Sequence, residues 1–361
     1  MKTGGRGPPY SEVPYARPYP CPVHIHVTYT GGTIGMVDSP RGLVPGADPE
    51  NRFDAVLKEA GESIGDVSLT ALSPLIDSSD ATPESWQRII DDLRAGASEA
   101  DAFVVLHGTD TMAHTCAALS YALTDLDRPV VVTGSQLPLG AVGSDAAPNI
   151  AGALHAAASR RAQGVSLFFG HRLLAGNRAV KASSWAFDAF DSPAVAPLAR
   201  AGAPWRWAPA PPRGAGWPDP RPYTRQDVVV IDLAPGITAA RLEAMLTPRP
   251  DAVILRAFGV GNIPDGEPGL TDVLASAIGA GTAVVVISQC HHGEVRLGRY
   301  AAGDALARAG AVGGADMTPE AAYAKAVFLL SQGLRGAELA AWMGRSEEHT
   351  SELQSPIVIS Y

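Results

Sequence analysis

Three short segments of the sequence are rich in hydroxyl and carboxylate side chains. Each follows an apolar stretch, and two of the three also contain glycine. They are Thr30–Thr33 (TGGT), Asp77–Asp80 (DSSD) and His107–Thr111 (HGTDT). The apolar stretches predict β-strands, and ligands bind at the carboxyl ends of strands in an open α/β sheet. Threonine and serine hydroxyls at such places can act as nucleophiles when a base accepts their proton. The three segments therefore predict a site at the carboxyl edge of a sheet.

The first segment contains two adjacent glycines, Gly31 and Gly32, after the strand predicted from Val23 onward. Glycine lets the backbone turn sharply and approach a ligand without a Cβ atom in the way. Dinucleotide and phosphate loops need G-x-G-x-x-G or G-x-x-x-x-G-K-S/T spacing, and neither is present here. Two interpretations stay open from these residues alone: Thr33 is a hydroxyl nucleophile on a tight turn, or the segment is a plain β-turn.

One further cluster, Cys290-His291-His292-Gly293-Glu294, has the residue types of a zinc site. Successive residues of an extended segment point to opposite faces, so these side chains cannot all reach one tetrahedral ion. No C-x-x-C or H-x-x-x-H pattern elsewhere in the chain supports a metal centre. The sequence therefore predicts no metal ligands.

Size and composition limit the classes of protein that this chain can represent. The chain has 361 residues, of which 46% are hydrophobic, a net charge of −9 and a pI near 5.5. This size permits a large core and two domains, and the acidic balance argues against nucleic-acid binding. No apolar run is long enough to span a membrane. The three cysteines, Cys21, Cys116 and Cys290, are odd in number and far apart, which indicates reduced thiols in the cytoplasm.

Strand and helix patterns alternate along most of the chain. Strands are predicted from Val23 and over Val67–Leu72, Ala102–Leu106, Val130–Thr133, Val165–Phe169, Val228–Leu233, Ala252–Leu255 and Ala283–Ser288. Helices are predicted over Arg52–Ala60, from Thr82, from Met112, and over Ala147–Arg161, Thr238–Leu246, Leu270–Ile278 and Thr318–Gly333. This alternation predicts an α/β protein with two domains, each a mostly parallel sheet flanked by helices.

Changes in composition predict where the domains begin and end. Residues 1–20 are predicted to be a disordered Pro-rich tail, and residues 21–200 the N-terminal domain. Residues 201–225, rich in Pro, Gly and Trp, are predicted to be a linker to a smaller C-terminal domain over residues 226–344. Residues 345–361 begin RSEEHTSELQS, which resembles a translated sequencing adapter and has no apolar period. Residues 37–49 are polar and rich in Gly and Pro, and are predicted to be a flexible lid.

Taken together with Lys181, these segments resemble the bacterial L-asparaginase family, in particular its cytoplasmic type I branch. The resemblance runs in order from Val23 to Gly344. It rests on TGGTIGM (Thr30–Met36), DSSD (Asp77–Asp80), HGTDTM (His107–Met112), TGSQ (Thr133–Gln136), GNRAVKA (Gly176–Ala182), FDAF (Phe187–Phe190), GVGN (Gly259–Asn262) and GGADMT (Gly313–Thr318). The family implies the asparaginase fold and the hydrolysis of L-asparagine to L-aspartate and ammonia, without a cofactor.

The resemblance also implies catalytic roles for four residues. Thr33 would be the primary nucleophile, attacking the side-chain amide carbon of asparagine to give an acyl-enzyme. Thr109, Asp110 and Lys181 resemble the family's second triad, which activates a hydroxyl through a lysine amine and a carboxylate. Burial would make the lysine a better base, whereas the nearby carboxylate acts in the opposite direction; the sequence alone leaves this balance open.

Substrate-binding roles follow from the same resemblance. Asp110 would bind the α-amino group of asparagine, and Ser78 its α-carboxylate, with backbone N–H groups near Gly32 and Ser79 assisting. Asn262 resembles a residue that a neighbouring protomer lends to the site, so a homodimer or homotetramer is expected.

One departure from the family concerns the lid. The family carries a tyrosine within Gly-Tyr-x-Pro that contacts the nucleophile, whereas this chain has Gly42-Leu43-Val44-Pro45. Two alternatives to an asparaginase therefore stay open: a related glutamine-using amidase or amidotransferase subunit, and a non-catalytic asparagine-binding regulator. The presence of Thr33, Thr109, Asp110 and Lys181 favours an enzyme, because binding alone does not need the lysine.

Overall fold

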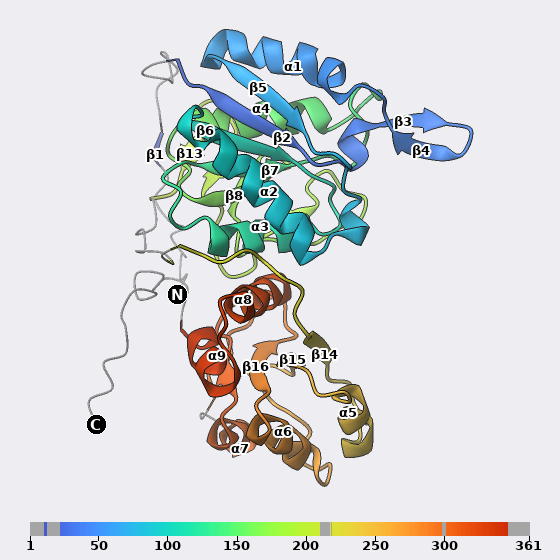
Figure 1. Ribbon diagram of the computed structural model, residues 1–361, viewed down its shortest axis with the longest axis vertical. Helices are drawn as coiled ribbons and strands as arrows, with labels where there is room; N and C mark the ends of the chain where they lie inside the picture. Colours follow the sequence, from blue (N-terminus) through green and yellow to red (C-terminus); the bar gives the residue numbers. More distant parts are fainter. Residues whose placement is uncertain (1–10, 13–21, 210–216, 218, 298–300, 346–361) are drawn as a thin grey trace, which may run out of the picture. The chain divides into compact units, whose positions relative to one another are not determined.

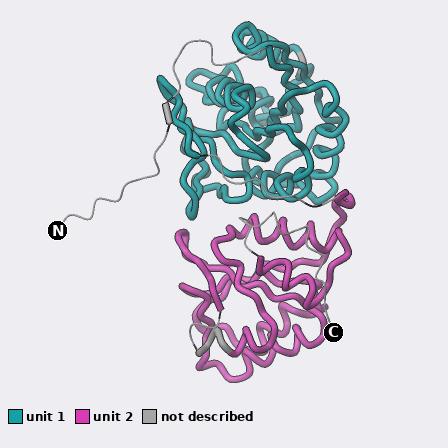
Figure 2. The backbone as a smooth tube through the Cα atoms, turned by 90° about the vertical axis from the view of Figure 1, so that its left-hand side faces the viewer, with its two compact units in different colours: residues 1–212 teal, residues 213–361 magenta. Residues whose placement is uncertain are grey.

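The computed structural model describes residues 11–12, 22–209, 217, 219–297 and 301–345 (Figure 1). The chain divides into two compact units, Met1–Pro212 and Arg213–Tyr361 (Figure 2). Each unit contains one main sheet with helices packed against it. No helix in the described part of the chain is both long and apolar enough to cross a membrane.

The sheet of the first unit has a parallel centre. Its parallel strands are β2 (Ile25–Tyr29), β5 (Val67–Ala71), β6 (Ala102–Leu106), β7 (Val130–Thr133) and β8 (Val165–Phe169), in the spatial order β5-β2-β6-β7-β8. Strands β6, β7 and β8 are buried along their whole length, as their continuous apolar sequences predict. In the register of this sheet, Val27 of β2 lies between Leu69 and Val104.

Four shorter strands extend this sheet beyond β8 in antiparallel fashion. They are β9 (Arg172–Ala175), β12 (Ala199–Arg200), β13 (Arg206–Trp207) and β1 (Ser11–Glu12). Two predictions need correction here: β13 lies in the predicted linker, and β1 lies in the predicted disordered tail, the rest of which is outside the described residues. Trp207 explains why a strand forms within the predicted linker. Its side chain is buried in the core, and its backbone pairs with both Ala199 and Ser11.

Helices cover both faces of this sheet (Figure 1). They are α1 (Pro49–Ile64), α2 (Pro83–Ala95), α3 (Met112–Ala122) and α4 (Ala146–Ala158); α1 packs on α4, and α2 packs on α3. The predicted start of α2 is confirmed, because Thr82 and Ser85 form a capping box before the first turn. The apolar face of α2, Trp86, Ile89, Ile90 and Leu93, is buried as its spacing predicts.

Short elements connect these layers near the carboxyl ends of the parallel strands. They are the 3-10 helices η1 (Thr33–Gly35) and η2 (Ser78–Asp80), the hairpin β3 (Met36–Ser39) and β4 (Gly42–Pro45), and the paired strands β10 (Val180–Lys181) and β11 (Phe190–Asp191). Another 3-10 helix, η3 (Gly96–Ser98), follows α2. The predicted lid is thus largely a β-hairpin, in which Leu43 pairs with Asp38.

The second unit repeats the α/β pattern on a smaller scale. Its parallel sheet has the order β14 (Val228–Asp232), β15 (Ala252–Ala257), β16 (Ala283–Ser288) and β17 (Val312–Gly313). Its helices are α5 (Ala239–Met245), α6 (Leu270–Gly279), α7 (Ala301–Ala309), α8 (Pro319–Ser331) and α9 (Gly336–Met343). The predicted fold class, two α/β units with mostly parallel sheets, is confirmed.

The end of the second unit includes one residue that the sequence assigns to the tail. The Arg345 carbonyl accepts a hydrogen bond from the buried Lys325 ammonium at 2.9 Å, and the Arg345 guanidinium lies 3.8 Å from the centre of the Trp342 ring. The positive charge of Lys325 suits this position, since the carbonyls at the end of α9 carry partial negative charge. Arg345 therefore belongs to the folded unit rather than to the tail, and residues 346–361 lie outside the described residues.

Candidate active site

The strand order of the first sheet reverses between β2 and β6. The chain passes from β2 to β5 on one side of the sheet centre and then to β6 on the other side. In doubly wound sheets, ligands bind where the order reverses in this way. The segments Thr30–Thr33 and His107–Thr111 follow β2 and β6 directly, and Asp77–Asp80 follows β5.

Hydrogen bonds hold these three segments together. The Thr30 hydroxyl donates to the Leu106 carbonyl at 3.0 Å, and the Thr30 carbonyl accepts from the Ile76 N–H at 2.6 Å. The Thr111 hydroxyl donates to the Ser78 carbonyl at 2.7 Å. The structure therefore brings the three predicted segments to one place.

The two glycines before Thr33 are required by close backbone packing. Their φ angles are +129° at Gly31 and +89° at Gly32, a region that favours glycine. A Cβ atom on Gly31 would lie 2.4 Å from the Ile76 carbonyl oxygen, and one on Gly32 would lie 2.3 Å from Gly108 Cα. The segments after β2, β5 and β6 therefore touch through backbone atoms, which only glycine permits.

Thr33 opens the 3-10 helix η1, directly after this contact. Its carbonyl accepts the Met36 N–H, and the next residue, Ile34, is fully buried. The Thr33 side chain is half-buried, and its hydroxyl makes no hydrogen bond within the described part of the chain. Ile34 therefore anchors the turn, while the Thr33 hydroxyl has no hydrogen-bond partner there.

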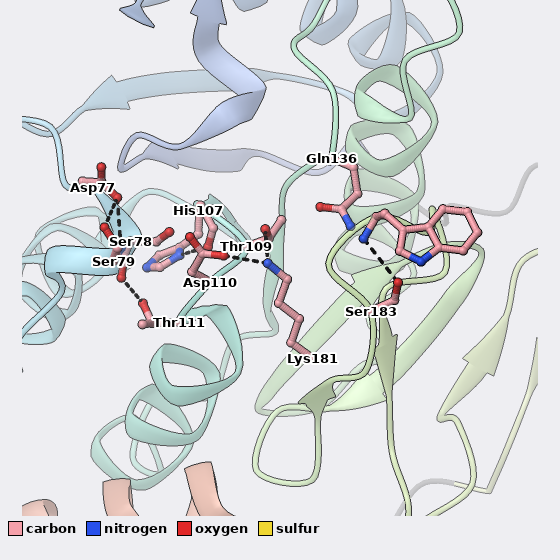
Figure 3. A network of polar contacts seen from close by, with 12 residues as sticks. Asp77, Ser78, Ser79, His107, Thr109, Asp110, Thr111, Gln136, Lys181 and Ser183 are labelled. Carbon is pink, nitrogen blue, oxygen red and sulfur yellow. Dashed lines mark hydrogen bonds and ion pairs between the residues drawn. The ribbon is translucent and has the colours of Figure 1, made fainter. Parts of the chain in front are cut away.

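Lys181 joins the segment after β6 through its ammonium group (Figure 3). Lys181 Nζ donates to Thr109 Oγ1 at 2.9 Å and to Asp110 Oδ1 at 2.7 Å. The side chains of Lys181 and Asp110 are 19% and 63% exposed. Strand β10, which carries Lys181, is fixed by its pairing with β11. Two neighbouring residues after β6 thus meet a lysine from a distant part of the chain, as the resemblance implies.

A buried histidine, His107, lies in the same segment as Thr109, two residues before it (Figure 3). Burial lowers the pKa of His107, so the ring is neutral at pH 7. Its Nδ1 lies 2.7 Å from the Gly108 carbonyl oxygen, and its Nε2 lies 3.1 Å from Thr115 Oγ1. Because a carbonyl only accepts, Nδ1 carries the proton, and Nε2 accepts from the threonine hydroxyl. This tautomer fixes the carbonyl of Gly108 next to Thr109.

Ser78 and Ser79, which follow β5, differ in the groups that their side chains face. Ser78 is buried, and its hydroxyl would lie 2.5 Å from a Cβ atom on Gly108, so it faces the segment after β6. Ser79 donates both its N–H and its hydroxyl to Asp77 Oδ1, each at 2.9 Å (Figure 3). Asp77 thus uses the Ser79 N–H to cap η2, and the expected role of the backbone near Ser79 in substrate binding stays a prediction.

One residue and one cluster singled out in the sequence belong to the second unit. Asn262 is exposed, and its N–H and carbonyl both bond to the backbone of Phe258. It is not in the unit that holds Thr33, so its expected role stays a prediction. The Cys290–Glu294 cluster contains no arrangement of three His, Cys, Asp or Glu residues that could hold a metal ion, and no such group occurs elsewhere in the described residues.

One residue that shapes the site is missing from the sequence-based predictions. Asp145, next to the start of α4, is buried, and its carboxylate accepts the N–H groups of Gln136 and Leu137 and the Asn149 amide, all at 3.0–3.1 Å. The Gln136 amide in turn donates to the Ala186 carbonyl at 3.1 Å, beyond the strand that carries Lys181. From the sequence, Asp145 is indistinguishable from an ordinary helix cap, so no local signal identifies it.

Two family models match the chain. Residues 24–212 match the family described as Asparaginase, N-terminal, and residues 227–343 match the Glutaminase/Asparaginase C-terminal domain. The first match covers most of the unit that contains Thr33 and Lys181, and the second covers most of the smaller unit.

Individual relatives agree with these matches. The chain is 45% identical over 313 residues to L-asparaginase 1 of Escherichia coli (strain K12), covering 86% of this chain and 92% of the relative. It is 37% identical over 328 residues to the 60 kDa lysophospholipase of Homo sapiens, covering 84% of this chain and 57% of the relative. The crystal structure of L-asparaginase I from Vibrio cholerae O1 biovar eltor has a TM-score of 0.83 and 40% identity, covering 91% of this chain and 98% of that one.

The predicted family is thus supported by two consecutive domain matches, by sequence identity over most of the chain, and by the fold itself. The chain belongs to the asparaginase family.

Proposed function

We propose that this chain hydrolyses L-asparagine to L-aspartate and ammonia, with Thr33 as the nucleophile. The observation that carries the proposal is the contact of Lys181 Nζ with Thr109 Oγ1 at 2.9 Å and with Asp110 Oδ1 at 2.7 Å. This contact joins an amine, a second hydroxyl and a carboxylate at the carboxyl edge of the sheet, next to the Thr33 turn. The L-asparaginase 1 of Escherichia coli, 45% identical to this chain, supports the same activity.

In the first half of the reaction, Thr33 Oγ1 attacks the carbon of the substrate's side-chain amide. The hydroxyl proton passes toward Thr109 Oγ1, whose own proton passes to a neutral Lys181 amine. Collapse of the tetrahedral intermediate breaks the C–N bond, and the nitrogen takes up a proton and leaves as ammonia. The product is a β-aspartyl ester of Thr33.

Asp110 can serve both the relay and the binding of substrate. Its carboxylate contacts the Lys181 ammonium through Oδ1 at 2.7 Å. Because the Asp110 side chain is 63% exposed, its carboxylate can also bind the α-ammonium of asparagine.

The second half of the reaction returns the enzyme to its starting state. Water attacks the ester carbon and gives up a proton to the relay of Thr109 and Lys181. The bond between that carbon and Thr33 Oγ1 breaks, Thr33 regains its proton, and L-aspartate leaves. Ser78 and the backbone around Gly32 would hold the substrate's α-carboxylate throughout.

We propose a cytoplasmic homodimer or homotetramer as the working form. The reason is that Asn262, which the family resemblance places near the substrate, lies in the second unit and is exposed. A neighbouring protomer could therefore supply it.

The test is to incubate purified protein with L-asparagine and to measure ammonia and aspartate together. The proposal expects equal amounts of both products, and slower release of ammonia from L-glutamine at the same concentration. Faster turnover of glutamine would favour the glutamine-using alternative. Binding of asparagine by calorimetry without any ammonia release would favour a regulator and contradict the proposal.

A further inference from the structure

We propose that Arg52, on the first turns of α1, is a positioning residue that fixes the Thr33 turn and the base of the β3–β4 hairpin. Its guanidinium Nη2 donates to the Met36 carbonyl at 2.8 Å and to the Leu139 carbonyl at 3.0 Å. Met36 begins the hairpin directly after η1, and Leu139 lies in the loop between β7 and α4. One nitrogen therefore ties together three separate parts of the chain. The catalytic half of this inference rests on the proposed function.

Both carbonyls belong to segments that are already bonded to the Thr33 turn. The Leu139 N–H donates to the Ile34 carbonyl at 3.0 Å, and the Gly46 N–H donates to the Gly35 carbonyl at 3.0 Å. Ile34 and Gly35 are the two residues that follow Thr33 in η1. Arg52 thus closes a ring of hydrogen bonds that includes Met36, Ile34 and Leu139, and Thr33 directly precedes Ile34.

Tyr29 packs against the Thr33 turn from the side of the hydrophobic core. A Cβ atom on Gly35 would lie 2.0 Å from the Tyr29 hydroxyl, so the tyrosine packs directly on the glycine backbone. Burial raises the pKa of Tyr29, and the positive charge of Arg52 opposes this shift. The turn is therefore held between a rigid buried ring and a charged donor.

Arginine suits this role better than lysine does. A guanidinium nitrogen presents two N–H groups in a fixed plane, and here Nη2 uses them on two carbonyls. A lysine ammonium has a shorter reach and no planar fork. Misplacement of a catalytic group by about 1 Å can cost ~100-fold in rate. Loss of this donor should therefore affect Thr33 through the backbone of the turn.

The experiment compares Arg52→Met, Arg52→Lys and a matched control, Arg128→Met. Arg128 is also half-buried and donates to two backbone carbonyls, those of Ala100 and Asp127, but at the amino ends of β6 and β7. Both methionine variants keep the apolar stem and lose two hydrogen bonds to carbonyls. They should therefore lose similar amounts of global stability. Comparing their thermal unfolding midpoints shows whether a change in exchange or kcat comes from a general loss of stability.

Two measurements are made on each variant: hydrogen exchange of the amides over residues 34–46, and kinetics on L-asparagine. In Arg52→Met we expect exchange to rise at least about fivefold and kcat to fall at least about tenfold, with KM changed less than about threefold. Arg52→Lys should lie between this variant and the wild type. Arg128→Met should match the wild type in both measurements.

The proposal is overturned if exchange over residues 34–46 in Arg52→Met equals that in Arg128→Met, or if exchange rises while kcat stays unchanged. If Arg52→Met fails to fold, the same criteria are applied to Arg52→Lys. If the wild type releases no ammonia from asparagine, the proposed function fails. The exchange measurement then still decides whether Arg52 anchors the turn.

Discussion

Lys181 has two hydrogen-bond partners, Thr109 and Asp110, and the proposed relay uses only the first for proton transfer. Lys181→Met keeps the length of the side chain but removes the amine. We expect kcat on asparagine to fall at least ~100-fold, because a positioned base or proton shuttle contributes about that much. Steady-state kinetics check this, with the exposed Lys58→Met as the control. An unchanged kcat with a raised KM would make Lys181 a binding residue instead.

His107 should make stability depend on pH. Burial lowers the pKa of His107 in the folded state, whereas an unfolded histidine titrates near 6.5. Below about pH 6.5 the unfolded state therefore binds more protons, and the stability falls as the pH falls toward the lowered pKa. Between pH 7.5 and 5, this residue should account for a loss of about 1–2 kcal/mol in the free energy of unfolding.

Urea unfolding at the two pH values measures this loss, with His107→Gln as the comparison. The variant should lose less stability on acidification than the wild type, since other titrating groups, including the half-buried His155, are common to both. Equal losses in the two proteins would show that His107 does not carry the effect.

At the scale of residues, the sequence predicts the types of side chain in the site but not their contacts. Thr109 and Lys181 are 72 positions apart, and no local spacing joins them. Only the family resemblance placed the lysine near this site. Asp145 and Arg52 escaped prediction for a related reason: each acts on backbone groups of distant loops, and such contacts leave no pattern in the sequence.

Among the elements, the β3–β4 hairpin is the one that differs from the family's pattern in a residue that bears on chemistry. Leu43 on β4 is 44% exposed, and the Thr33 hydroxyl makes no hydrogen bond to a described residue. If no other group replaces the missing phenol, Leu43→Tyr should raise kcat, by up to about tenfold per 1.4 kcal/mol of stabilisation. We expect instead that another group activates Thr33, so that the bulkier ring obstructs closure of the hairpin and lowers kcat.

The control for this change is Leu43→Phe, which adds the ring without the hydroxyl. The difference in kcat between the two variants isolates the hydroxyl from the effect of size. If Tyr and Phe give the same kcat, another group or ordered water must activate Thr33.

The elements themselves were predictable to different degrees. Strand β6 was found with its predicted bounds, Ala102–Leu106, because its apolar run is continuous. Strand β2 was found because apolar, β-branched residues alternate along it. The strands β12 and β13 were not found, because two residues carry no periodicity and their pairing depends on neighbours such as β9. The lid was predicted as a flexible segment, since Gly and Pro in residues 37–49 obscure the strand pattern of the hairpin.

For the whole molecule, the boundary at Arg345 leads to a prediction about stability. Ending the chain after Arg345 keeps the carbonyl that accepts from Lys325. We expect its melting temperature to stay within about 2 °C of the full chain, since residues 346–361 are mostly polar without an apolar period, and surface changes alter stability by about 0.5 kcal/mol or less. Thermal unfolding of both chains tests this, and a fall of about 10 °C would show that the removed residues pack against the fold.

The central claim is that Thr33 forms the acyl-enzyme, and the kinetics of Thr33→Ala on L-asparagine test it most directly. The variant should fold, because Thr33 is only half-buried and Ile34 and the glycine turn hold the backbone. We expect kcat to fall by about four orders of magnitude, as for other deleted nucleophiles, while Thr33→Ser, which keeps a hydroxyl, retains measurable turnover. A folded Thr33→Ala protein that keeps about a tenth of the wild-type kcat would contradict the claim.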